Sequence, residues 1–254
     1  MSERYNVLGV GISAINMSQA LQQIDTWIAA RDHQYVCVCN VHSVMECRRS
    51  VEVRRVFNRA GMVTPDGMPL VWLLRNAGYA HVSRVYGPDL MLAAMGHSLV
   101  TGHRHYLYGG VAGVSAELAE VMRTRFPGIT IAGAGTPAFG PVEELSSDAV
   151  AQSIDQARPD IVWVGMSSPK QDLWMSVMRA RLQAPVLIGV GAAFDFHAGR
   201  VPQAPRWMMQ SGLEWLFRLK QEPRRLWRRY LVDNPWFLFE IGRQKLGLKQ
   251  FGLD

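Results

Sequence analysis

Hydrophobic and polar positions follow two alternating patterns along the first 200 residues. Short apolar runs rich in β-branched residues predict six strands, and helical periodicity between them predicts seven helices. This alternation, with short Gly/Pro connections, predicts an α/β fold whose mostly parallel, Rossmann-like sheet has helices on both faces. The predicted strands are Tyr35–Cys39, Gly61–Thr64, His105–Tyr108, Ile129–Ala132, Ile161–Val164 and Val186–Val190. The predicted helices are 18–30, 43–59, 67–77, 89–100, 115–126, 143–157 and 171–182.

The strand pattern stops at Pro205, and the rest of the chain is predicted to be helical. Three helical segments follow, with breaks expected near Pro223 and Pro235. We therefore expect two parts, an α/β domain over residues 1–204 and a helical appendage over residues 205–254.

Charge separates the same two parts. The chain of 254 residues has a formal net charge of +6. Ten basic and four acidic residues lie between Arg206 and Lys249, and the seventeen basic and seventeen acidic residues elsewhere cancel. Four of the eight tryptophans lie in that basic stretch. The sequence thus predicts a neutral body and a basic, Trp-rich C-terminal region.

No apolar run approaches the ~20 residues that a membrane-spanning helix needs. The Val7–Ile15 run is short, has no cleavage site after it and is read as buried strands with their turns. We expect a cytoplasmic protein. Cys37 and Cys39 alternate in one strand and face the same side of it, so they are expected to be buried, reduced thiols, as is Cys47.

The predicted strands end in polar or glycine-rich segments, which is where ligands bind in parallel α/β sheets. In chain order these segments are Asn40-Val-His42, Pro65-Asp66-Gly67, Gly109-Gly110-Val-Ala-Gly113, Gly133-Ala-Gly135-Thr136, Gly165-Met-Ser-Ser-Pro-Lys170-Gln171 and Gly191-Ala-Ala-Phe-Asp195.

These segments, in this order, resemble the WecG/TagA/CpsF family of bacterial glycosyltransferases. The likeness also includes Arg84-Val-Tyr-Gly-Pro-Asp89-Leu and the C-terminal run from Ala204-Pro-Arg-Trp to Glu222-Pro-Arg-Arg-Leu-Trp-Arg-Arg-Tyr230, so it covers nearly the whole chain. It implies transfer of a hexose or N-acetylhexosamine from a UDP-sugar to an undecaprenyl-diphosphate-linked saccharide in polysaccharide synthesis. Members often have Thr two residues before the Asn, where this chain has Val38, and this difference suggests a different donor sugar.

Inverting sugar transfer needs a base for the acceptor hydroxyl, and Asp66 is the candidate. From the residues alone, Asp66 is equally well explained as an N-cap of the next helix, and the resemblance favours the base. Asn40 is expected to bind a sugar hydroxyl or a diphosphate oxygen, although a turn residue that bonds its own backbone is the alternative. Gln171 is expected to position donor or acceptor, and His42 is a minor candidate.

The remaining candidates are expected to bind the donor. Glycine turns and helix N-termini present backbone amides to a diphosphate, and Lys170 adds a charge. Arg84 and Asp89 either contact substrate or pair with each other, and Asp195 either binds donor hydroxyls or caps a turn. The expected substrate-binding set is Arg84, Asp89, Gly109, Gly110, Gly135, Gly165, Lys170 and Asp195.

Neither a metal nor an organic cofactor is expected. The chain contains no Asp-x-Asp to hold a divalent ion on the nucleotide, which favours a metal-independent reaction. The segment from Gly9 to Ala14 fits the dinucleotide pattern G-x-G-x-x-G/A, but the acidic residue expected after the next strand is missing.

The basic C-terminal region is expected to contact an anionic membrane surface or the diphosphate of the acceptor. Arginines one helical turn apart, with Trp and Leu between them, are typical of a helix in the bilayer interface, so peripheral association with the inner face of the membrane is expected. The candidates are Arg206, Arg218, Arg224, Arg225, Arg228 and Arg229. There are three alternatives to a membrane or diphosphate contact: a solvated basic helix, an interface with a second copy of the chain, and a nucleotide- or nucleic-acid-binding arm in a protein without catalysis. Of these partners, a nucleic acid is not expected.

Overall fold

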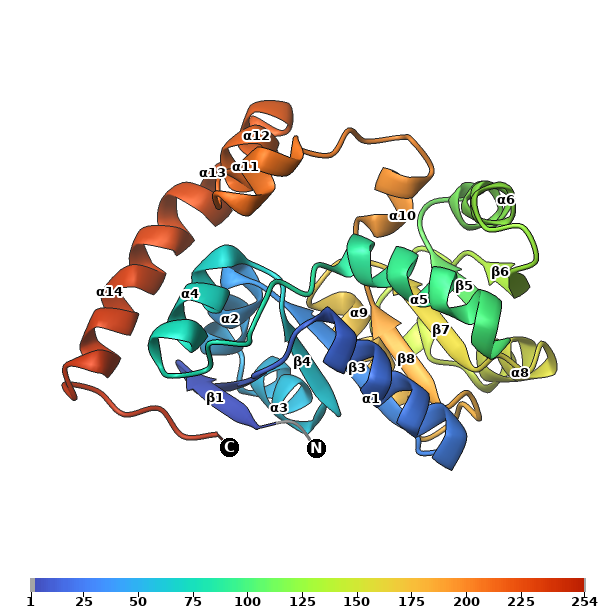
Figure 1. The fold of residues 1–254 in the computed structure, drawn as a ribbon, viewed down its shortest axis with the longest axis horizontal. Helices are drawn as coiled ribbons and strands as arrows, with labels where there is room; N and C mark the ends of the chain where they lie inside the picture. The colour runs from blue at the N-terminus through green and yellow to red at the C-terminus, as the bar shows by residue number, and fades with distance from the viewer. Residues whose placement is uncertain (1–2, 254) are drawn as a thin grey trace.

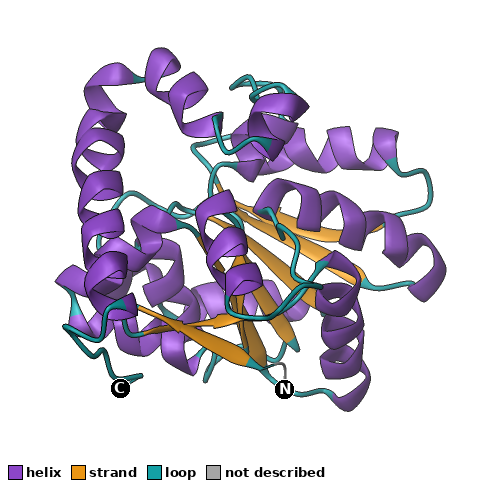
Figure 2. Cartoon of the chain, turned by 60° about the vertical axis from the view of Figure 1, so that its left-hand side comes forward, coloured by secondary structure: helices purple, strands orange, loops and turns teal. Residues whose placement is uncertain are grey.

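The structure is a computed structural model that describes residues 3–253. Its centre is a six-stranded parallel sheet in the order β4-β3-β8-β7-β5-β6, and Figure 2 shows helices around it on both sides. All neighbouring strands are parallel, so their carboxyl ends lie along one edge. The strands are β3 (Gln34–Cys39), β4 (Met62–Pro65), β5 (Arg104–Gly109), β6 (Thr130–Gly135), β7 (Ile161–Gly165) and β8 (Val186–Gly189). The predicted fold class is confirmed.

Helices cover both faces of the sheet because successive side chains in each strand point to opposite faces. In β3, Val36 packs into one core, and Cys37 and Cys39 pack into the other. The first core receives α1 (Met17–Ala30), α5 (Gly87–Thr101), α6 (Val114–Arg125) and α10 (Ala193–His197). The second receives α2 (Val41–Arg49), α3 (Val51–Arg59), α4 (Met68–Asn76), α7 (Val142–Leu145), α8 (Asp148–Gln156) and α9 (Lys170–Met178). The three cysteines are buried and free, as predicted.

The N-terminal apolar run forms an antiparallel hairpin of β1 (Arg4–Val7) and β2 (Val10–Ser13). Gly9, at φ 88°, lies in the hairpin turn. The dinucleotide-like segment is therefore a turn followed by a strand, whereas a dinucleotide fingerprint needs a turn that opens a helix.

The C-terminal region forms α11 (Arg206–Gln210), α12 (Glu214–Gln221), α13 (Pro223–Trp227), a π-helical turn (Arg228–Val232) and α14 (Asp233–Lys245). Figure 1 shows these elements as an arch over the sheet, with α14 descending along one side toward the N-terminal hairpin. Phe237 and Ile241 of α14 are buried in the second core. Gln244 bonds the backbone of Asn6 and Leu8, so the end of the chain closes onto its beginning. The division into two domains at residue 204 stays a prediction.

Three element predictions are wrong in detail. The helix expected over 43–59 is two helices, because Ser50 adopts extended backbone and caps α3. The helix expected over 143–157 is divided in the same way at Ser147, which caps α8. The break expected at Pro235 is absent. That proline lies in the first turn of α14, where a helix tolerates a missing N–H, directly after the π-helical turn.

Candidate active site

A cleft of about 680 Å³ opens where the carboxyl ends of β4, β3 and β8 meet the C-terminal helices. Its floor consists of residues that follow these strands and the loop after β7. Its outer wall comes from α12, α13 and the π-helical turn. The candidates Asn40, Asp66, Arg84, Gln171, Asp195, Arg218, Arg225 and Arg229 all line it, together with His42 and Val38. Residues predicted from widely separated segments are therefore brought to one place.

Asp66 lies directly after β4, with 8% of its surface exposed. The N-cap alternative is wrong, because Gly67 is the N-cap of α4 and no side chain caps that helix. The Asp66 carboxylate instead accepts hydrogen bonds from Arg84 Nη2 at 3.1 Å and from Asn40 Nδ2 at 3.4 Å. Burial, with a contribution from Glu214, raises the pKa of Asp66 above its usual value, and Arg84 and Asn40 oppose this shift. A carboxyl group of this kind suits a general base.

Arg84 connects Asp66 to the C-terminal region. Its Nη2 also donates to Glu214 Oε2 of α12 at 2.6 Å, and its guanidinium lies 4.1 Å from the centre of the Tyr86 ring. Burial alone would lower the pKa of Arg84, but the carboxylates of Asp66 and Glu214 outweigh it and raise that pKa. The expected pairing of Arg84 with Asp89 is wrong, since Asp89 pairs with Arg206 at 2.8 Å.

The local backbone role considered for Asn40 is confirmed, and binding of substrate by Asn40 stays a prediction. Its Oδ1 accepts from the Ser43 amide at 3.2 Å, which makes it the N-cap of α2. Its Nδ2 donates to Asp66, and its Oδ1 also lies 3.4 Å from Arg229 Nη2. Burial lowers the pKa of Arg229, and its Nε has no hydrogen-bond partner among residues 3–253. Arg229 therefore lines the cleft with a buried donor that has no partner in the described part of the chain.

Gln171 is buried in the first turn of α9, where its Oε1 accepts the Gly191 amide at 2.9 Å. This contact fixes the turn after β8, at the base of the cleft. Asp195 lines the cleft at the N-terminal end of α10.

The glycines at the ends of β5, β6 and β7 lie along the same edge of the sheet but do not line the cleft. Gly109 and Gly165 end neighbouring strands, and a Cβ on Gly109 would meet the Gly165 backbone at 2.6 Å. Gly135 is the last residue of β6, so this strand is longer than predicted. Gly135 faces the Tyr106 and Tyr108 rings. Lys170 Nζ donates to the Gly140 carbonyl at 2.7 Å. Of the predicted donor-binding residues, Asp89, Gly109, Gly110, Gly135, Gly165 and Lys170 do not line the cleft.

The predicted C-terminal arginines divide into two groups. Arg218 and Arg225 line the cleft and both pair with Glu222, at 3.6 Å and 2.6 Å, and Arg229 lines it too. Arg206, Arg224 and Arg228 are exposed on the outer surface. In the described part of the chain, no helix is long and apolar enough to cross a bilayer.

One group of three side chains, among residues 3–253, has the spacing of a metal site: His42, Glu46 and Asp233. Arg49 forms ion pairs with both carboxylates. A guanidinium thus already supplies the positive charge that a metal would bring, so these residues fit an ion pair better than a metal site.

Comparison with known proteins decides the family. The model of the glycosyl transferase WecG/TagA/CpsF family matches residues 5–251. The chain belongs to the WecG/TagA/CpsF glycosyltransferase family. It is an enzyme, and the alternative of a binding protein without catalysis is not retained.

Three relatives of this family are named N-acetylglucosaminyldiphosphoundecaprenol N-acetyl-beta-D-mannosaminyltransferase. The Bacillus spizizenii protein is 30% identical over 206 residues, which is 81% of this chain and 78% of the relative. The Bacillus subtilis protein is 32% identical over 196 residues, 77% of this chain and 74% of the relative. A Staphylococcus aureus protein is 24% identical over 249 residues, 97% of this chain and 95% of the relative.

For this family member, sequence reasoning missed several residues of the cleft. Glu214 shares Arg84 with Asp66, Trp215 and Tyr230 form other parts of the wall, and Ser167 forms part of the floor. Glu214, Trp215 and Tyr230 lie inside the C-terminal run that carries the resemblance, so that run was the available signal. The partner of Glu214 is 130 residues away, and no local pattern indicates it.

Proposed function

We propose that this glycosyltransferase moves a sugar from a UDP-sugar to a sugar on a polyprenyl diphosphate, with inversion, and that Asp66 is its general base. The observation that carries the proposal is the buried Asp66 carboxylate that lines the cleft, with a pKa raised by burial and with Arg84 and Asn40 bonded to it. Asp66 would take the proton of the acceptor hydroxyl while the nucleotide leaves from the opposite face of the donor sugar.

The cations of the cleft support a diphosphate substrate. Arg218, Arg225 and Arg229 line the wall formed by the C-terminal helices. Arginine binds phosphate oxygens through two parallel hydrogen bonds. We assign these three side chains to the acceptor diphosphate, and the amides of the turns after β7 and β8 to the donor.

The names of the relatives suggest the first substrates to test. N-acetylglucosaminyl-diphosphoundecaprenol is the acceptor in those names, and N-acetylmannosamine is the transferred sugar. Purified enzyme would be given this acceptor and a panel of UDP-sugars, one of them radiolabelled in each assay. Transfer of label into the lipid fraction from at least one donor supports the proposal. Retention of all label in the water-soluble fraction across the panel contradicts it.

The donor sugar is expected to depend on Val38, whose side chain lines the cleft two residues before Asn40. A threonine here would add a hydroxyl of nearly the same volume. We expect Val38→Thr to change the ranking of UDP-sugars in a thermal-shift panel, because a tightly bound donor raises Tm by mass action. An unchanged ranking would show that Val38 does not contribute to specificity for the donor sugar.

We also propose that the outer surface of the C-terminal helices binds the membrane that holds the acceptor. Exposed arginines occur there together with exposed apolar side chains, among them Trp207, Leu216, Trp227, Leu231, Trp236 and Phe239. Aromatic side chains at headgroup depth and about 1 kcal/mol per basic residue favour binding to anionic lipid.

Sedimentation with anionic vesicles tests this surface. The double variant Arg224→Ala/Arg228→Ala is expected to weaken binding by ~30-fold, since two basic residues contribute about 2 kcal/mol. Arg55→Ala/Arg59→Ala is the matched control, because it removes the same charge from exposed positions on α3. Equal losses in both variants would show that only net charge matters and would reject a specific membrane surface.

A further inference from the structure

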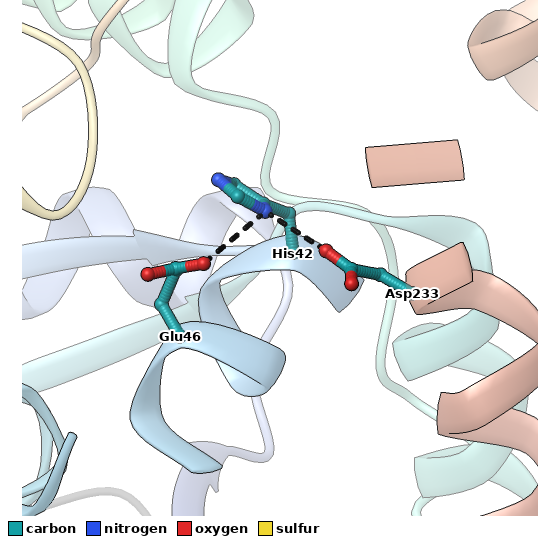
Figure 3. Close-up of side chains that lie close together, drawn as sticks. All are labelled: His42, Glu46 and Asp233. Carbon is teal, nitrogen blue, oxygen red and sulfur yellow. Dashed lines mark hydrogen bonds and ion pairs between the residues drawn. The ribbon is translucent and has the colours of Figure 1, made fainter. Parts of the chain in front are cut away.

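His42 lies in the first turn of α2, two residues after Asn40, and it lines the cleft. Its Nδ1 is 3.4 Å from Asp233 Oδ2 of α14 and 3.9 Å from Glu46 Oε1. Figure 3 shows Nδ1 turned toward these two carboxylates, with the other ring nitrogen pointing away from both. Among residues 3–253, Nε2 has no hydrogen-bond partner. The edge of the ring that remains available to a ligand is therefore the Nε2 edge.

The protonation state follows from the surrounding charges. Burial and then Arg229 lower the pKa of His42 below its usual value, although Glu46 and Asp233 act in the opposite direction. At neutral pH the ring is uncharged and carries one proton. A carboxylate can only accept a hydrogen bond, so Asp233 holds that proton on Nδ1. Nε2 then presents a lone pair, which accepts a hydrogen bond from a hydroxyl group.

Asp233 is held in place for this task by Arg49. Asp233 has 4% of its surface exposed, and its carboxylate pairs with Arg49 of α2 as well as approaching His42. The C-terminal region thus reaches the same helix turn that Asn40 caps. Asn40 in turn donates to Asp66, so His42 lies on the side of the cleft where an acceptor hydroxyl must meet its base.

We propose that His42 contacts the acceptor sugar, with Nε2 accepting a hydrogen bond from one of its hydroxyls, and that Asp233 is the positioning residue that selects the required tautomer. This inference rests on the proposed function for the identity of the acceptor. It gives the C-terminal region a second task besides binding diphosphate and lipid, since docking of α14 prepares a side chain inside the cleft.

Kinetics test the contact with the sugar. His42→Ala removes the acceptor atom and is expected to raise KM for the lipid-linked sugar about five- to tenfold, the usual loss for one neutral hydrogen bond. KM for the UDP-sugar should stay unchanged. His42→Gln keeps a hydrogen-bond acceptor on a side chain of similar reach and should recover part of the loss. An unchanged acceptor KM in His42→Ala, with the wild type active, overturns the inference.

The positioning role has a matched pair of variants. Asp233 and Glu240 are both buried acids of α14 that pair with neighbouring arginines of α2, Arg49 and Arg48. Both Asp233→Ala and Glu240→Ala weaken the docking of α14, but only Asp233→Ala removes the partner of His42. We expect the acceptor KM to rise in Asp233→Ala alone. Equal rises in both variants would reduce Asp233 to a docking residue and contradict its positioning role.

Nitrogen-15 NMR of the enzyme without substrate reads the tautomer directly, with His42→Gln identifying the signal. The expected result is a neutral ring protonated at Nδ1 in the wild type, with a shift toward protonation at Nε2 in Asp233→Ala. A wild-type ring protonated at Nε2 overturns the inference and leaves the proposed function intact. Absence of sugar transfer by the wild type overturns the proposed function. The NMR spectrum is recorded without substrate and does not depend on that activity.

Discussion

The molecule buries two carboxyl groups near the carboxyl edge of its sheet, Asp66 and Asp172, in different surroundings. Asp66, 8% exposed, lines the cleft and is bonded to Arg84 and Asn40. Asp172, in the first turn of α9, is fully buried beside Cys37 and Ser168 and has no cationic partner among the residues that the structure describes. Burial raises the pKa of both, that of Asp172 to about 6, and the nearby Ser168 hydroxyl and Cys37 thiol oppose the shift at Asp172. Burial alone therefore does not identify a catalytic base.

What distinguishes Asp66 is access and a neighbouring cation. Arg84 opposes the effect of burial on the pKa of Asp66 and so favours its ionised form, and the cleft gives a substrate hydroxyl a route to it. Asp172 has neither, and it faces thiols on β3 and α2 whose own pKa values burial raises. The comparison predicts that Asp66 controls turnover and that Asp172 affects stability.

The largest expected effect belongs to Asp66→Asn. Loss of a positioned general base typically costs 10²–10⁴ in rate, so we expect kcat to fall about 10³-fold. Asparagine still accepts from Arg84, and circular dichroism should show a folded enzyme. The matched control Asp172→Asn should keep kcat within about threefold. Comparable turnover in the two variants would remove the distinction between the carboxyl groups.

Arg84→Met has the next largest expected effect. It removes the cation that opposes burial at Asp66, so the pKa of Asp66 rises further. The active form of the base is ionised, and activity is lost as pH falls through this pKa. We expect the acid limb of the pH–rate profile to move to higher pH, with kcat at neutral pH reduced ~10²-fold. An unmoved acid limb would contradict the coupling between the two residues.

The smallest effect concerns stability and the sign of its pH dependence. The pKa of Asp172 is higher in the folded protein, about 6, than its usual value of 3.8, so the folded state binds the proton more tightly. The contribution of Asp172 to stability is therefore favourable at low pH and is lost as pH rises from the usual pKa of 3.8 through the folded-state pKa of about 6. A shift of about two pKa units corresponds to roughly 3 kcal/mol in the free energy of unfolding, which is the upper limit of this contribution.

Thermal melts of Asp172→Asn at pH 5 and pH 8 measure this effect. The variant does not ionise, so its Tm should exceed that of the wild type at pH 8, and the difference should shrink at pH 5. A larger gain at pH 5 than at pH 8 would show that Asp172 is stabilising when ionised.

Local patterns predicted much of the fold because the strands are apolar, short and followed by glycine or polar residues. The six strands of the main sheet were located to within about three residues at each end, and the candidates that follow β3, β4 and β8 meet in the cleft. Breaks at Ser50 and Ser147 were missed, since a serine within a helical period is compatible with either a continuous helix or a cap.

Long-range partners explain the remaining errors. Arg84 and Asp89 are close in sequence and were considered a pair, yet each has its partner in the C-terminal helices, Glu214 and Arg206. Asp172 directly follows Gln171 and was not a candidate, and nothing in the sequence shows that its carboxyl group is buried without a cation beside it. Ion pairs between distant segments depend on how the C-terminal region folds back, which periodicity does not report.

The most direct test of the account is the acid limb of the pH profile of kcat/KM, measured for the wild type and for Asp172→Asn. If Asp66 is the base, the limb reports the ionisation of Asp66, lies above pH 3.8 and has the same midpoint in both proteins. A limb that moves or vanishes when Asp172 is replaced would make the fully buried carboxyl group the one that controls turnover, and the assignment of Asp66 as base would be wrong.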